Sequence, residues 1–160
     1  MNLGHVIKTG AISGLIYGIL QGGVSLLSYI FYREQIIEMI QKSIPSNIPI
    51  SIEQIVNIGM VMSMPSSAIA GIFVGILTSV IFSLIHRELM GKNSKVKGVF
   101  LCVLISVAVI IGEFIQPNVT SGLFMIHTRF PVLAPLSFAC FLIFGYLLGM
   151  FYDRFRVNHE

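Results

Sequence analysis

The chain has 160 residues, of which 55% are hydrophobic and only 11% are charged, and its formal net charge at pH 7 is +3. A soluble domain is usually about 25% charged, and one of this length leaves roughly 30% of its chain surface exposed to water. This composition excludes an ordinary soluble domain and indicates a membrane protein. The small net charge, without aromatic residues interleaved among the basic ones, excludes nucleic acid as an expected partner.

Four apolar stretches are long enough to cross the hydrocarbon core of a bilayer, which takes a helix of about 20 residues. Their approximate ranges are 9–32, 66–86, 98–116 and 131–152. The sequence therefore predicts an all-α protein, in which residues 1–160 form a single transmembrane domain built as an integral membrane four-helix bundle. The first stretch is too long for a cleavable signal peptide and lacks a small-residue cleavage site, so we interpret it as a retained span.

The segment after the first span has the apolar period of a helix. Ile36, Ile37, Ile40 and Ile44 fall on one face, and charged or amide side chains occupy most of the remainder. This pattern predicts a short amphipathic external helix between spans one and two. We expect it at the membrane interface or across the external ends of the spans, with an ordinary ordered loop as the alternative.

The apolar run that contains the second span is too long for one straight crossing. Ser51 and Gln54 have the spacing of a capping box, which predicts a helix beginning there. We expect Pro65 to divide the run, so that a short helix ends near Met62 and the span begins near Ser66. A single long helix kinked at Pro65 is the alternative.

Polar side chains within the apolar runs are interpreted as structural. Gln21 is expected to form a hydrogen bond between helices. Ser63 and Ser66 are expected to satisfy backbone groups freed by the neighbouring proline, although they could instead line a polar entrance. Cys102 and Cys140 are interpreted as two small buried hydrophobic residues without a disulfide between them.

The basic residues are distributed unevenly between the two predicted sides. One side holds Lys8, Arg87, Lys92, Lys95, Lys97, Arg154 and Arg156, and the other holds Arg33, Lys42 and Arg129. The side richer in lysine and arginine remains in the cytoplasm. We therefore predict cytoplasmic N- and C-termini, external segments at 33–64 and 117–129, and a location in the plasma membrane.

Small residues recur at every fourth position in three of the predicted spans. They are Gly10, Gly14, Gly18 and Gly22 in the first, Ser67, Gly71, Gly75, Ser79 and Ser83 in the second, and Gly145 and Gly149 in the fourth. Small residues at this spacing let helix backbones approach closely in a membrane. The pattern predicts tight helix contacts, with the same chain, a second copy or another protein as the partner.

Glu113 is the one acidic residue within a predicted span, near the end of the third. An ionisable group at membrane depth is costly and is often functional. It is therefore the candidate site for a cation or a proton. The alternative places Glu113 at the external headgroup level, hydrated or paired with Arg129.

The sequence contains no motif that predicts catalysis or a cofactor. The histidines are His5, His86, His127 and His159, and none is predicted inside a span. Metal and haem sites need facing ligands, so neither is expected. Phosphate-loop, zinc-protease and serine-hydrolase signatures are missing, and a lipid-modifying enzyme is disfavoured by the lack of paired ionisable groups.

The leading functional hypothesis is a non-catalytic structural or assembly subunit, with the lipid bilayer and either other membrane subunits or further copies of this chain as partners. The alternative is a small oligomeric transporter or channel that uses Glu113 as its membrane carboxylate.

Overall fold

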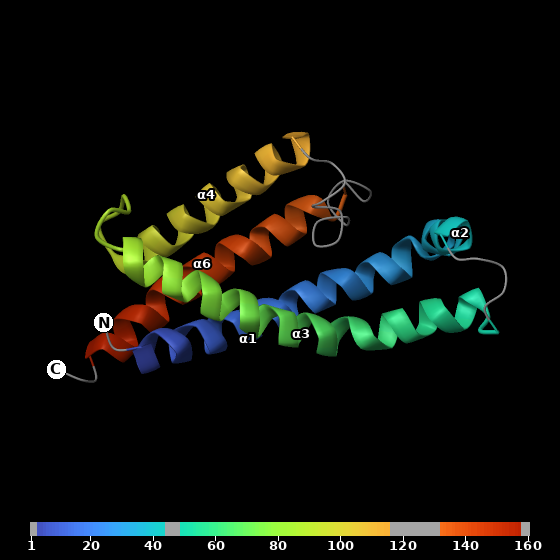
Figure 1. The fold of residues 1–160 in the computed structure, drawn as a ribbon, viewed down its shortest axis with the longest axis horizontal. Coiled ribbons are helices and arrows are strands. Elements are labelled where there is room, and N and C mark those ends of the chain that lie inside the picture. The colour runs from blue at the N-terminus through green and yellow to red at the C-terminus, as the bar shows by residue number, and fades with distance from the viewer. Residues whose placement is uncertain (1–2, 44–48, 116–131, 158–160) are drawn as a thin grey trace.

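A computed structural model describes residues 3–43, 49–115 and 132–157, and within these ranges the chain is helical apart from short turns. The helices are α1 (Leu3–Phe31), α2 (Arg33–Ser43), α3 (Ile52–Ile85), α4 (Ser94–Ile115) and α6 (Ala134–Val157), as drawn in Figure 1. Four of them are long and apolar enough to cross a membrane: α1, α3, α4 over Ser94–Ile111, and α6 over Ala134–Phe155. The predicted all-α class and the four helices of membrane-spanning length are thereby confirmed.

The expectation that Pro65 separates two helices is wrong, because α3 is one helix of 34 residues with Pro65 inside it. The helix begins with the predicted capping box. The backbone N–H of Gln54 donates to the Ser51 hydroxyl at 3.3 Å, and the backbone N–H of Ser51 donates to the Gln54 side chain at 3.1 Å.

Two serine hydroxyls near Pro65 donate hydrogen bonds to backbone carbonyl groups of α3. Pro65 has no backbone N–H, and its ring crowds the carbonyl group one turn earlier. The Ser63 hydroxyl donates to the carbonyl oxygen of Met60 at 2.7 Å, and the Ser66 hydroxyl donates to that of Met62 at 2.5 Å. The carbonyl group that loses its N–H partner to Pro65 is that of Val61, so these serine bonds lie on either side of the freed group rather than on it.

The helices pack in two antiparallel pairs. α1 packs most extensively on α3, α4 packs on α6, and contacts between α1 and α6 join the pairs. Figure 1 shows the start of α1, the end of α6 and the turn between α3 and α4 at one end of the molecule, which we name the terminal end. The helix α2 lies at the opposite end, which we name the α2 end.

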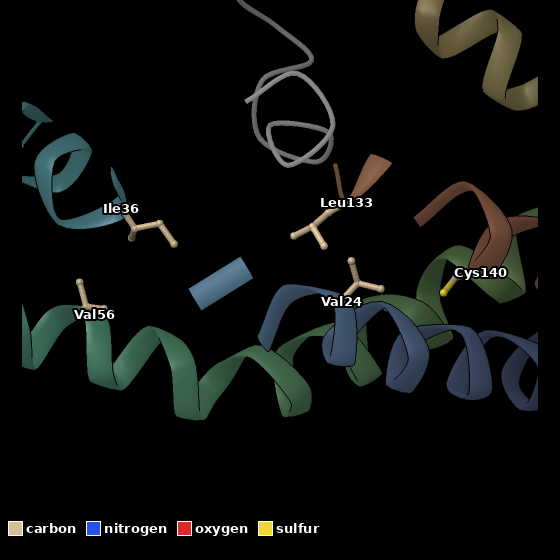
Figure 2. Packing of buried hydrophobic residues seen from close by; sticks show 5 residues of the cluster. All are labelled: Val24, Ile36, Val56, Leu133 and Cys140. Atoms are coloured by element: carbon tan, nitrogen blue, oxygen red, sulfur yellow. The ribbon is translucent and has the colours of Figure 1, made fainter. Parts of the chain in front are cut away.

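Two clusters of buried apolar side chains hold these pairs together. Figure 2 shows the cluster toward the α2 end, formed by Val24, Ile36, Val56, Leu133 and Cys140. The second cluster, toward the terminal end, is formed by Phe82, Leu89, Leu101 and Leu148. Because Ile36 of α2 is buried together with Val56 of α3, and Ile37 and Ile40 are partly buried against the same cluster, α2 packs on the rest of the chain through these side chains. As interpreted from the sequence, Cys102 and Cys140 are free and buried.

Candidate functional site

The most extensive glycine contact between helices runs along the glycine positions of α1 and α3, which we name the long seam. Its residues are Gly10, Gly14, Gly18 and Gly22 of α1 and Ser67, Gly71 and Gly75 of α3. A methyl group added to Gly14 would lie 2.8 Å from the Cα of Gly75, and one added to Gly71 would lie 2.6 Å from the Cα of Gly18. Real Cβ atoms essentially never approach within 3.0 Å, so this register requires glycine at positions 14 and 71.

Hydroxyl groups add polar contacts to the long seam. The fully buried Ser79 of α3 donates to the carbonyl oxygen of Val6 on α1 at 2.7 Å. The buried Ser13 hydroxyl donates to the carbonyl oxygen of Thr9, also at 2.7 Å, within its own helix. The first of these bonds ties the two helices together near the terminal end, beyond the last glycine contact at Gly10.

A second and shorter seam joins α4 to α6. We name it the short seam, and its residues are Ser94, Gly98, Gly145 and Gly149. A methyl group added to Gly145 would lie 2.6 Å from the carbonyl oxygen of Gly98, and one added to Gly149 would lie 2.6 Å from the Cα of Lys95. Sequence reasoning selected Gly145 and Gly149 but missed Gly98.

A signal for Gly98 is present in the sequence. Ser94, Gly98, Cys102 and Ser106 recur at every fourth position, but only one of the four is a glycine. A search for glycine repeats passes over such a stripe, whereas a search for any small residue at this spacing finds it.

The joint between the two pairs combines an amide with aromatic rings. Gln21 of α1 donates from Nε2 to the hydroxyl of Ser137 on α6 at 3.2 Å, which confirms the predicted hydrogen bond between helices. The ring of Tyr17 lies 5.6 Å from that of Phe141 and 5.1 Å from that of Phe144, centroid to centroid. This joint holds α1 and α6 together without glycine contacts.

The candidate carboxylate, Glu113, lies in the last turn of α4. Its side chain is outside the described residues, as is the whole of Arg129. The prediction of a cation or proton site at Glu113 therefore remains a prediction, and so does its alternative pairing with Arg129.

A group of polar and aromatic side chains at the terminal end was not predicted. We name it the His86 cluster, and its members are His86, Ser94, Lys97, Tyr152 and Asp153. Nε2 of His86 lies 2.9 Å from Oγ of Ser94, and the Ser94 hydroxyl donates to the Asp153 carboxylate. Nζ of Lys97 donates to the backbone carbonyl oxygen of His86 at 2.6 Å.

Aromatic rings enclose the imidazole of this cluster. The ring of Tyr152 stacks on that of His86 at 5.0 Å and 29°, and Phe82 meets both rings edge-on at 5.1 Å. Sequence reasoning found His86 at a helix end but not its partners, because Ser94 and Asp153 are 59 residues apart and come from different helices.

Within the ranges that the structure describes, no three His, Cys, Asp or Glu side chains lie together as a metal site would need. Comparison with protein-family models, with curated proteins and with solved structures gives no match. The function is therefore argued from the contacts of this chain alone.

Proposed function

We propose that this protein is a non-catalytic membrane subunit, which acts by helix packing within a larger membrane complex or a homo-oligomer. The observation that carries the proposal is the long seam. Backbone contact from Gly10 to Gly18 holds α1 and α3 close together, because glycines at the contact let the two backbones approach. A closely packed pair of this kind suits a scaffold on which other helices assemble.

The outward faces of this unit are available to a partner or to lipid. Phe73, Leu77 and Leu84 of α3 are 66–67% exposed. Large apolar side chains also project from α4 at Val107 and Ile110. The small residues of the seams are used within the chain, so an assembly partner would meet these large side chains rather than the glycines.

Affinity purification of the full chain from native membranes in a mild detergent tests the proposal. We expect other membrane proteins, or further copies of this chain, to co-purify in constant proportion. If the interface lies on α3, replacing both Phe73 and Leu77 with alanine should reduce the amount of partner that co-purifies. Replacing both Val107 and Ile110 with alanine is the matched change on α4, and it should reduce the co-purification if the interface lies there instead. Recovery of the wild-type chain alone and monomeric would contradict the proposal.

We also propose that α1, α3, α4 and α6 cross the bilayer as a bundle, with the terminal end in the cytoplasm and α2 as an amphipathic helix outside. The exposed basic residues Lys8, Arg87, Lys92 and Arg154 at the terminal end support this orientation. A cysteine at Asn93 should resist a membrane-impermeant thiol reagent in intact cells, whereas one at Gln41 should react. The buried Cys102 and Cys140 give a low background, and the reverse labelling pattern would overturn the orientation.

A transporter or channel is the second candidate, because Glu113 is the only acidic residue in α4. Flux of protons or cations into proteoliposomes, compared between wild type and Glu113→Gln over a pH series, tests it. The glutamine keeps the size and hydrogen bonding but removes the charge, so coupled flux should be lost. Flux no greater than that of empty liposomes would contradict the transporter or channel, and the subunit would then be the remaining proposal.

A further inference from the structure

The His86 cluster connects three helices at one point of the terminal end. His86 directly follows α3, Ser94 is the first residue of α4, and Asp153 lies in the last part of α6. Ser94 is only 6% exposed, so its hydroxyl is largely shielded from competing water. The connection therefore fixes the α3–α4 turn on the end of α6.

The direction of the hydrogen bonds follows from the chemistry of the three groups. An ionised carboxylate only accepts hydrogen bonds, so the single hydroxyl proton of Ser94 points to Asp153. The Ser94 oxygen must then accept from His86, which requires a proton on Nε2 of the imidazole. Both neutral imidazole with this tautomer and the imidazolium ion satisfy that requirement.

We propose that the His86 cluster is a proton-controlled latch, which closes the α3–α4 turn onto α6 more tightly when His86 is protonated. The imidazolium keeps the bond to Ser94 and adds a positive charge that attracts Asp153 through the shared hydroxyl. It also gains from the stacked ring of Tyr152, because an aromatic face attracts a cation. Histidine is the side chain that ordinarily changes charge in the physiological range.

Several other charged or titratable groups lie at this end of the molecule. Lys97 of α4 is bound to the backbone carbonyl of His86 rather than to its ring. In the following turn, Arg87 and Glu88 are exposed, so solvent screens them. From α1, Lys8 lies over the ring of Phe155 at 4.8 Å, and His5 belongs to the same end of that helix. The contacts of the imidazole ring that favour its protonated form are the hydrogen-bond chain through Ser94 to Asp153 and the stacked ring of Tyr152.

Hydrogen exchange of the full chain reconstituted in lipid tests the latch. Backbone amides of the α3–α4 turn and of the first turn of α4 would be compared at about pH 6 and about pH 8, on either side of the ordinary histidine range near 6.5. After correction for the intrinsic pH dependence of exchange, we expect several-fold stronger protection at the lower pH. Equal corrected protection at both values would overturn the proposal.

Two variants separate the latch from a merely structural contact. His86→Gln retains a hydrogen-bond donor but cannot become charged, and Asp153→Asn retains an acceptor but has no charge to attract the imidazolium. Each should lose the pH dependence, and either variant that keeps the full wild-type pH dependence overturns the proposal. If one fails to fold, the other and the wild-type comparison still decide.

The role of the Ser94 hydroxyl is tested by a variant at this position and a matched control in the same helix. Ser94→Ala should weaken protection at both pH values, because it breaks the chain of hydrogen bonds. Ser106→Ala removes a hydroxyl from the same helix, one that bonds only to the Cys102 carbonyl oxygen at 2.9 Å. It should leave both the protection and its pH dependence unchanged, and equal losses in the two alanine variants would count against the latch.

Discussion

Between α1 and α3 the glycine contacts continue from Gly10 to Gly22, whereas the described glycines of α4 and α6 make theirs near the terminal end, where Gly98 meets Gly145. In lipid, helices gain little from hydrophobic burial and depend on close packing and hydrogen bonds. The α1–α3 pair obtains that packing along several turns mainly from its glycines, with the Ser79 hydrogen bond at one end. The α4–α6 pair has a shorter contact, and the hydrogen bonds of the His86 cluster lie beside it. The two pairs of antiparallel helices are therefore joined differently: α1 and α3 by a long series of glycine contacts, and α4 and α6 by a short one beside a group of hydrogen bonds.

The largest effect is expected from a methyl group in the long seam. Gly14→Ala places a Cβ against the backbone of Gly71 and Gly75, so the helices must separate, at a cost of about 1–3 kcal/mol of unfolding free energy. Gly23→Ala is the matched control, because nothing lies within 4 Å of the added atom. It should be neutral or stabilise by about 0.5–1 kcal/mol through helix propensity. Thermal unfolding in detergent measures both, and equal midpoints would show that the seam does not carry stability.

A smaller effect is expected from the same change in the short seam. Gly145→Ala would press on the carbonyl oxygen of Gly98 and on the sulfur of Cys102. Because the contact occupies one end of the pair, α4 can swing away, and we expect a loss toward the lower end of the roughly 1–3 kcal/mol range. The unfolding midpoint should fall between those of Gly14→Ala and Gly23→Ala. A loss larger than that of Gly14→Ala would reverse the comparison.

The smallest effect is expected at the α2 end, outside both seams. Lys42 contacts Glu38 at 2.7 Å, and its hydrogen bond and charge hold the pKa of Glu38 below the ordinary value. A carboxyl group whose pKa is lowered by folding stabilises the folded state at pH values above the ordinary pKa of glutamate. This stabilisation is lost as the pH falls through the lowered pKa. The two side chains are exposed, so solvent screens the pair. Glu38→Gln should leave the midpoint of thermal unfolding at neutral pH unchanged. A shift of that midpoint as large as the one caused by Gly14→Ala would contradict this prediction and show that the ion pair of α2 stabilises the fold.

The sequence predicted the helices well because their signals are local. Apolar length predicted the four membrane-length helices, and Ser51 with Gln54 predicted where α3 begins. Spacing also selected the glycine faces of α1 and α3. It could not name their partner, because a repeat of four specifies a face of one helix and not what lies against it.

The errors and omissions have physical causes as well. Pro65 was expected to end a helix, but α3 continues through it, with serine hydroxyls bonded to backbone carbonyl groups nearby. The His86 cluster joins residues that only the tertiary fold brings together, so no local spacing reveals it. Glu113 was the strongest sequence candidate for chemistry, and its side chain is outside the described residues.

The unequal lengths of the helices have a consequence for the surrounding lipid. At about 1.5 Å per residue, the 29 residues of α1 and the 34 of α3 extend well beyond a hydrocarbon core of about 30 Å. The helices α4 and α6, with 22 and 24 residues, are closer to the thickness of that core. The long seam prevents α1 and α3 from tilting independently, so the pair must tilt or project as one body. Lipids on the two sides of the molecule would therefore meet different hydrophobic thicknesses, and such mismatch sorts proteins among membranes of different thickness.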